Sequence, residues 1–124
     1  MYKRQNIASK YWPGALTIVI PASDKQTLNL TSKDLTIGLR IPNSHMAQSL
    51  IRETGPLLTS SANISGFKVS TKVEVIALDF PSLKILSPIP WEKSSGKAST
   101  IIFWKKSGNW RLIREGEVLV RELH

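Results

Sequence analysis

The segment WPGALTIVIP, residues 12–21, indicates the fold class of this chain. The turn residues Pro13 and Gly14 precede a β-branched apolar run, ALTIVI (15–20), and Pro21 ends that run. A short β-branched run between turn residues is typical of a β-strand rather than a helix. The segment therefore predicts a strand over residues 15–20.

Six further apolar runs of the same kind follow along the chain, and most are bounded by Pro, Gly, Ser or Asn. They are residues 35–41, 57–60, 83–86, 100–104, 110–113 and 118–120. Ser107, Gly108 and Asn109 separate two of these runs and predict a hairpin turn. Strands are therefore expected along most of the chain.

Two segments carry helical signals instead. Residues 44–54 have an apolar stripe at helical spacing, with Asn43 or Ser44 as the N-cap and Gly55 at the end. The second predicted helix spans residues 71–78, because Thr71 and Glu74 have the spacing of a capping box. Since helices and strands are mixed along the chain, an α/β or α+β open sheet is expected.

The composition suits one intracellular domain with an anionic ligand. The 124 residues carry 17 Lys and Arg against 9 Asp and Glu, a formal net charge of +8. This excess either attracts a polyanion or forms an ordinary basic surface. The sequence contains no cysteine, no signal peptide pattern and no apolar run of the roughly 20 residues that span a membrane. We expect a soluble, cytoplasmic protein.

Small polar residues at the ends of predicted strands are the candidate ligand contacts. The loop LLTSSANISG (57–66) is either a ligand-binding loop at a strand end or an ordinary turn rich in Ser and Asn. Thr36 and Arg40 share one face of a strand, where Arg40 either holds a carboxylate or phosphate or faces solvent. Ser99 and Arg114 lie at the ends of two further runs.

Other chemistries have little support. The two histidines, His45 and His124, make a histidine-based metal cluster improbable, and no Gly-x-Ser-x-Gly elbow surrounds Ser61. The chain also lacks a phosphate-binding P-loop and a dinucleotide fingerprint. Trp104 and Trp110 flank the predicted hairpin, where they either stack on bases or pack in the core.

Five motifs, taken in chain order, resemble those of the YrdC/TsaC family. Residues 12–17 resemble its WPG-x-LT segment, 38–42 its strand ending in hydrophobic-Arg-hydrophobic-Pro, and 61–66 its SAN-x-SG loop. Residues 99–102 and 113–116 are similar to its STV and LR-x-G segments. The SAN-x-SG loop is the most specific of the five, and together they span almost the whole chain.

The resemblance implies a twisted open mixed α/β sheet with flanking helices and a positively charged cavity. It also implies a nucleotidyltransferase that joins L-threonine, bicarbonate and ATP, with Mg²⁺, into threonylcarbamoyl-AMP, releasing pyrophosphate. A downstream tRNA threonylcarbamoyl-transferase would use this product. The implied threonine-binding residues are Arg40, Ser61 and Ser99, and the implied ATP-binding residues are Thr36, Asn63, Thr71 and Arg114. No catalytic nucleophile or metal ligand is assigned, since positioning and charge neutralisation would carry the reaction.

The chain departs from the family pattern in two places. Glu115 stands where the family often has Pro, and the family's N-terminal segment with its Lys-x-Arg motif does not precede Trp12. We therefore expect a C-terminal fragment, inactive or weakly active by itself. Residues 1–5 (MYKRQ) are what GTG TAT AAG AGA CAG would encode if GTG is read as a start codon, and that string matches the end of a transposon adapter used in sequencing libraries. We expect these five residues to be adapter-derived and residues 6–124 to form a partial YrdC-like domain.

An alternative within the same superfamily is a YciO-like module that binds RNA or a nucleotide and has no synthase activity. Its basic surface would bind tRNA or double-stranded RNA. Threonine-dependent turnover of ATP separates the two interpretations.

Overall fold

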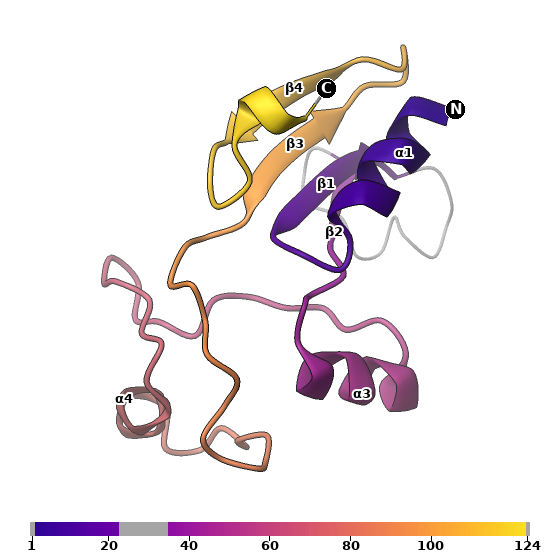
Figure 1. Ribbon diagram of the computed structural model, residues 1–124. Coiled ribbons are helices and arrows are strands. Elements are labelled where there is room, and N and C mark those ends of the chain that lie inside the picture. The colour runs from indigo at the N-terminus through magenta and orange to yellow at the C-terminus, as the bar shows by residue number, and fades with distance from the viewer. Residues whose placement is uncertain (1, 23–34, 124) are drawn as a thin grey trace. The chain divides into compact units, whose positions relative to one another are not determined.

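The computed structural model describes residues 2–22 and 35–123; Met1, residues 23–34 and His124 lie outside the described part. The chain divides into two compact units (Figure 1). The first comprises Met1–Pro56 and Lys97–His124, and the second comprises Leu57–Gly96. The two ends of the sequence therefore belong to one unit, and the middle of the sequence forms the other.

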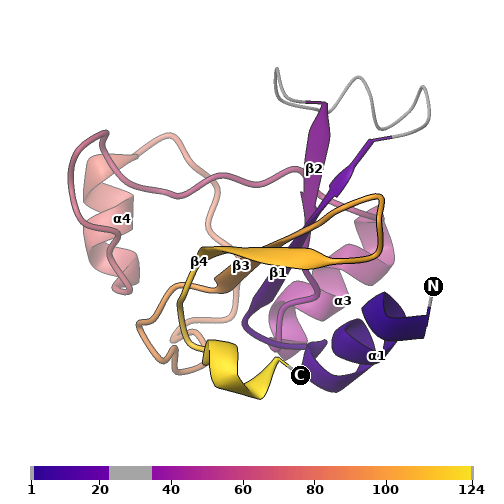
Figure 2. The ribbon, with the colours of Figure 1, turned by 90° about the horizontal axis from the view of Figure 1, so that it is seen from above.

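The first unit is built on a four-stranded mixed sheet with the order β2-β1-β3-β4 (Figures 1 and 2). The strands are β1 (Leu16–Pro21), β2 (Thr36–Leu39), β3 (Thr100–Trp104) and β4 (Trp110–Arg114). β1 and β3 are parallel neighbours, whereas β2 and β4 pair antiparallel to them at the two edges. The predicted mixed open sheet is confirmed, and these four strands match their predicted ranges to within two residues at each end.

Three helical segments accompany this sheet: α1 (Tyr2–Tyr11), α3 (His45–Thr54) and the 3₁₀ turn η1 (Val120–Glu122). The prediction of α3 is confirmed, because the Ser44 hydroxyl accepts a hydrogen bond from the Ala47 N–H at 3.2 Å. Gly55, with φ at +79°, ends the helix as expected. The sequence did not indicate α1, since its first turn contains no acidic residue.

One face of the sheet carries the hydrophobic core. The buried residues are Leu16 and Ile18 of β1, Ile102 and Trp104 of β3, and Leu123 after η1. Ile7, Ala8 and Tyr11 of α1 pack against this cluster. Because side chains alternate along a strand, the intervening residues of β1 and β3 point to the opposite face.

The second unit contains one helix, α4 (Val73–Asp79), and no strand. The strands predicted at 57–60 and 83–86 are therefore wrong. Leu58 is 79% exposed and Leu83 is 53% exposed. An apolar run becomes a strand only when another strand hydrogen-bonds to it, and this unit offers none.

Two further predictions are corrected. The run at 118–120 is not a strand, because the Val120 N–H donates to the Glu115 carboxylate at 2.9 Å and begins η1. Thr71 does not open α4, which begins at Val73 with Lys72 at its cap and no side-chain capping bond. The Lys72 N–H instead donates a hydrogen bond to the Ser70 hydroxyl at 3.1 Å.

Within the described residues, no helix combines the length and the apolar character that a membrane crossing requires.

The core predicts a test of the fold. Ile102 is fully buried, so Ile102→Ala should lower the free energy of unfolding by about 2–5 kcal/mol. The matched control is Ile113→Ala on the neighbouring strand, where the side chain is 51% exposed and the loss should stay below about 1 kcal/mol. Urea unfolding followed by circular dichroism measures both. Equal losses for the two variants would contradict the assignment of the core face.

Candidate functional site

The face of the sheet opposite the core carries polar side chains from neighbouring strands. Thr17 alternates with the buried Leu16 and Ile18, so it points away from the core. The register pairs Val19 with Gly38, and paired residues share a face. Arg40 lies two residues beyond Gly38 and therefore continues on the face that carries Thr17.

The strand directions bring four of these polar residues to one end of the sheet. β2 and β4 end there, at Leu39 and Arg114, whereas β1 and β3 begin there, at Leu16 and Thr100. This end of the sheet thus gathers one polar side chain from or beside each strand. The four residues are Thr17, Arg40, Ser99 and Arg114, and we call them the sheet-end cluster.

Arg114 and Thr17 hold Ser99 from two sides. The Arg114 guanidinium donates to the Ser99 carbonyl from Nε at 3.1 Å and from Nη2 at 2.8 Å. The Ser99 hydroxyl lies 2.8 Å from the Thr17 hydroxyl and 3.4 Å from Arg114 Nη2. Ser99 is only 8% exposed. Its hydroxyl is therefore fixed by neighbours on two strands, β1 and β4.

Arg40 is exposed and is tied to the turn before β1. Its Nε donates to the Gly14 carbonyl at 2.9 Å, and the Gly14 N–H donates to the Ile41 carbonyl at 2.8 Å. The first bond engages Nε alone, and the two Nη groups carry the other four N–H donors of the guanidinium. A guanidinium oriented in this way presents the donors that a carboxylate or phosphate binds in forked geometry.

The turn after β4 contacts the backbone of residues 98–100 beside the sheet-end cluster. The Gly116 N–H donates to the Thr100 hydroxyl at 2.9 Å, and the Glu117 N–H donates to the Ala98 carbonyl at 2.9 Å. A Cβ at Gly116 would lie 2.2 Å from the Ala98 carbonyl oxygen and 2.7 Å from the Ser99 carbonyl oxygen. Only glycine allows this approach, which keeps the Ser99 carbonyl in reach of Arg114.

Of the seven predicted site residues, the structure brings together Arg40, Ser99 and Arg114. Thr36 shares their face but pairs with Pro21 at the other end of the sheet. Four residues of extended chain separate it from Arg40 by roughly 13 Å. The remaining three, Ser61, Asn63 and Thr71, belong to the second unit.

In the second unit, Asn63 shapes the predicted loop. Its Nδ2 donates to the carbonyls of Ile64, at 3.2 Å, and Phe67, at 2.9 Å. Its Oδ1 is buried and has no hydrogen-bond partner. Ser61 and Thr71 are exposed. The loop is thus internally braced and keeps one acceptor unsatisfied, which a ligand donor would satisfy.

Sequence reasoning gave no role to Thr17, although the residue lies in the quoted WPG-x-LT segment. The alternation of Thr17 with apolar neighbours was the available signal. Its contact with Ser99 depends on the parallel pairing of Leu16 with Thr100, and local sequence does not carry that register.

The face of the sheet opposite the core, called the open face below, carries arginine side chains whose positive charge favours anions. Arg40 and Arg114 lie in the sheet-end cluster, and the Arg111 guanidinium lies over the Phe103 ring, 5.4 Å from its centroid. Within residues 2–22 and 35–123, no three side chains of His, Cys, Asp or Glu gather as metal ligands would. The arrangement provides guanidinium and hydroxyl donors rather than carboxylate ligands.

Comparisons with known proteins identify relatives of this chain. The Sua5/YciO/YrdC family model, described as "Telomere recombination", matches residues 2–116. The threonylcarbamoyl-AMP synthase of Bacillus subtilis (strain 168) is 38% identical over 79 residues, which are 62% of this chain and 23% of that protein. The corresponding synthase of Yersinia pestis (strain Pestoides F) is 38% identical over 78 residues, 61% of this chain and 41% of that protein.

Two solved structures of P. abyssi Sua5 share the fold. A variant of Sua5 gives a TM-score of 0.79 at 29% identity, over 99% of this chain and 38% of that one. Sua5 complexed with L-threonine gives a TM-score of 0.78 at 27% identity, over 99% of this chain and 36% of that one. The chain therefore spans well under half the length of each of these relatives.

The close backbone approach at Gly116 leads to a second prediction. Gly116→Ala should lower the free energy of unfolding by about 1–3 kcal/mol, because the added Cβ meets backbone that cannot yield. Gly38→Ala is the control, since its Cβ would make ordinary contacts at 3.5 Å with Thr17 and 3.8 Å with Val19. Its stability should stay the same or rise by up to about 1 kcal/mol. Thermal unfolding measures both, and a Gly116 variant as stable as the parent would refute the proposed close approach.

Proposed function

The chain belongs to the Sua5/YciO/YrdC family, and from that premise we propose that it is the C-terminal part of a threonylcarbamoyl-AMP synthase domain. The whole domain joins L-threonine, bicarbonate and ATP into threonylcarbamoyl-AMP and releases pyrophosphate, as a nucleotidyltransferase. Relatives named threonylcarbamoyl-AMP synthase support this assignment.

The observation that carries the proposal is the sheet-end cluster. Arg40 offers its Nη donors to the threonine carboxylate, and Ser99 offers a hydroxyl whose direction Thr17 and Arg114 fix. A related Sua5 has been solved with L-threonine, which supports threonine as the ligand. Ser61, in the second unit, is also proposed as a threonine contact, because its loop resembles the SAN-x-SG loop of the family.

The chemistry needs such a basic site because every substrate carries a negatively charged group. The threonine carboxylate, bicarbonate and the triphosphate of ATP repel one another when they are brought together. In the reaction the threonine nitrogen forms a bond to the bicarbonate carbon with loss of water, and an oxygen of the resulting carbamate forms a bond to the α-phosphorus of ATP. The bond from that phosphorus to the pyrophosphate oxygen breaks. Fixed guanidinium and hydroxyl donors lower the barrier by offsetting this charge without reorganising, so no covalent protein nucleophile is required.

ATP contacts are proposed for Thr36, Asn63, Thr71 and Arg114. Asn63 has the clearest physical support, because its buried Oδ1 lacks a partner and matches an amino-group donor. Mg²⁺ accompanies ATP as part of the substrate. We propose a cytoplasmic reaction whose product passes to a downstream tRNA threonylcarbamoyl-transferase.

Threonine binding tests the role of Arg40. Arg40→Gln should weaken L-threonine binding roughly 10- to 150-fold, the range that follows from losing a charge-assisted hydrogen bond. Lys105→Gln, on the exposed turn after β3, is the charge-matched control and should leave binding unchanged. Titration calorimetry measures both variants, and L-threoninamide should bind as weakly to the parent as L-threonine binds to the Arg40 variant. If Arg40→Gln binds L-threonine as the parent does, the assignment of the carboxylate site is wrong.

Pyrophosphate release separates the synthase from the YciO-like alternative. A longer protein that joins this chain to the family's N-terminal segment should release pyrophosphate only when L-threonine and bicarbonate are both present. Residues 1–124 alone should release it far more slowly. RNA binding by the longer protein without any dependence of ATP turnover on threonine would favour the YciO-like module instead.

A further inference from the structure

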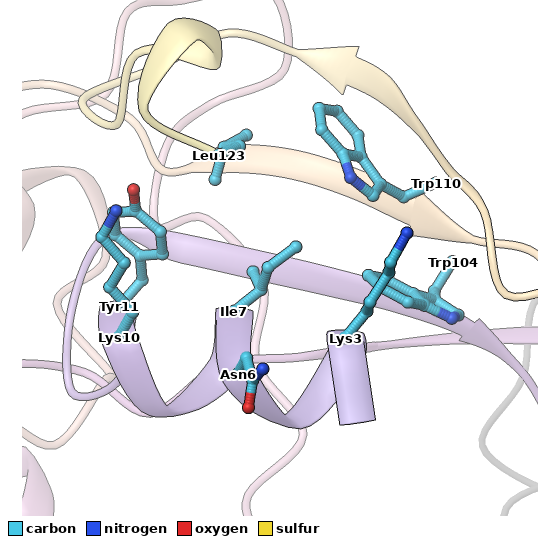
Figure 3. A pocket seen from close by; sticks show the side chains of 8 residues that line it. All are labelled: Lys3, Asn6, Ile7, Lys10, Tyr11, Trp104, Trp110 and Leu123. Atoms are coloured by element: carbon cyan, nitrogen blue, oxygen red, sulfur yellow. The ribbon is translucent and has the colours of Figure 1, made fainter. Parts of the chain in front are cut away.

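A pocket lies on the core side of the sheet, away from the sheet-end cluster. It opens between α1 and the β3–β4 hairpin and has a volume of about 440 Å³ (Figure 3). Trp104, one of its lining residues, belongs to the buried face, whereas Thr17 and Ser99 lie on the opposite face. The volume falls within the range of small-molecule sites in proteins. The pocket is therefore separate from the proposed threonine contacts.

Aromatic and aliphatic side chains form the floor and walls of this pocket. Trp104 and Trp110 face the same side because the register pairs them directly across β3 and β4. Trp104 is only 6% exposed, whereas Trp110 is half-buried and offers more of its ring to a ligand. Ile7 of α1 and Leu123 line the space between the helix and the hairpin (Figure 3). Flat rings pack well against such a surface.

The rim of the pocket is cationic. Lys10 and Asn6 of α1 supply an ammonium and an amide, and no Asp or Glu is among the lining residues. Lys10 Nζ lies 3.2 Å from the Glu122 carbonyl oxygen and 5.1 Å from the centre of the Tyr11 ring. The contacts with this carbonyl and this ring position the Lys10 ammonium beside the pocket. Lys3, near the start of α1, also lines the pocket.

The wall beside Lys10 is fixed by the C-terminal turn. The Tyr11 hydroxyl donates to the Glu122 carbonyl, the same oxygen that Lys10 contacts. Leu123, the next residue, is 1% exposed and anchors the turn in the core. These contacts join α1 to the C-terminal turn on this side of the pocket.

We propose that this pocket binds a planar aromatic anion, a flat ring that bears a carboxylate. The ring stacks on Trp110 between Ile7 and Leu123, and the carboxylate accepts from Lys10 and Asn6. The Lys10 ammonium would repel a cationic ligand, and a neutral ring would lack the charge attraction to it. A non-planar anion would lack the stacking on Trp110. This inference does not depend on the proposed synthase activity, because the residues lie on the other face of the sheet.

The four tryptophans allow a direct test by NMR on the 124-residue chain. 2-Naphthoate should shift the indole N–H signals of Trp104 and Trp110. Trp12 and Trp91 do not line the pocket, and their indole N–H groups donate to the carbonyls of Leu16, at 2.7 Å, and Leu86, at 2.9 Å. Their signals should stay in place as internal controls. The neutral 2-naphthamide and the non-planar cyclohexanecarboxylate should each bind more weakly than 2-naphthoate.

Two variants test which side chains of the pocket contribute to binding of the probes. Lys10→Gln should weaken 2-naphthoate binding about threefold and leave 2-naphthamide binding unchanged. Trp110→Leu should weaken binding of both aromatic probes about tenfold. Lys105→Gln controls for the general loss of one positive charge. The proposal is overturned if 2-naphthoate and 2-naphthamide bind equally, if Lys10→Gln does not reduce that preference, or if all four indole signals move together.

Discussion

Strands β1 and β3 lie side by side in parallel although most of the chain separates them in sequence, and Leu16 pairs with Thr100. This pairing buries Leu16, Ile18 and Ile102 on one face with almost no exposure. On the other face the same register sets the Thr17 hydroxyl 2.8 Å from that of Ser99. The core and the candidate site are thus two consequences of one ladder, because alternate side chains of a strand serve opposite faces.

The two faces differ in chemistry as well as in burial. The covered face meets α1 and the C-terminal turn and is apolar, and Lys3 and Lys10 of α1 add positive charge at the pocket. The open face carries Arg40 and Arg114 around a hydroxyl pair. The proposed anion site is therefore built from strand ends, where the side chains of neighbouring strands converge, and Gly116 permits the close approach of two backbones there.

Local sequence predicted those parts of the fold that local physics determines. β-Branched runs bounded by turn residues located the four strands, and the Ser44 cap with Gly55 located α3. The same runs at 57–60 and 83–86 failed, because strand formation needs a partner that sequence patterns do not name. For the site, motifs located Arg40, Ser99 and Arg114, but Thr17 was missed and Thr36 lies at the other end of the sheet.

We propose that the sheet-end cluster, and not the face that packs against α1, binds L-threonine. Chemical-shift mapping of the 124-residue chain with L-threonine tests it most directly. We expect shifts at Thr17, Arg40, Ser99 and Arg114, including the Arg40 Nε–H that donates to Gly14. The indole signals of Trp104 and Trp110 should not move. Shifts centred on α1 and those two indoles, or no shifts at all at saturating L-threonine, would contradict it.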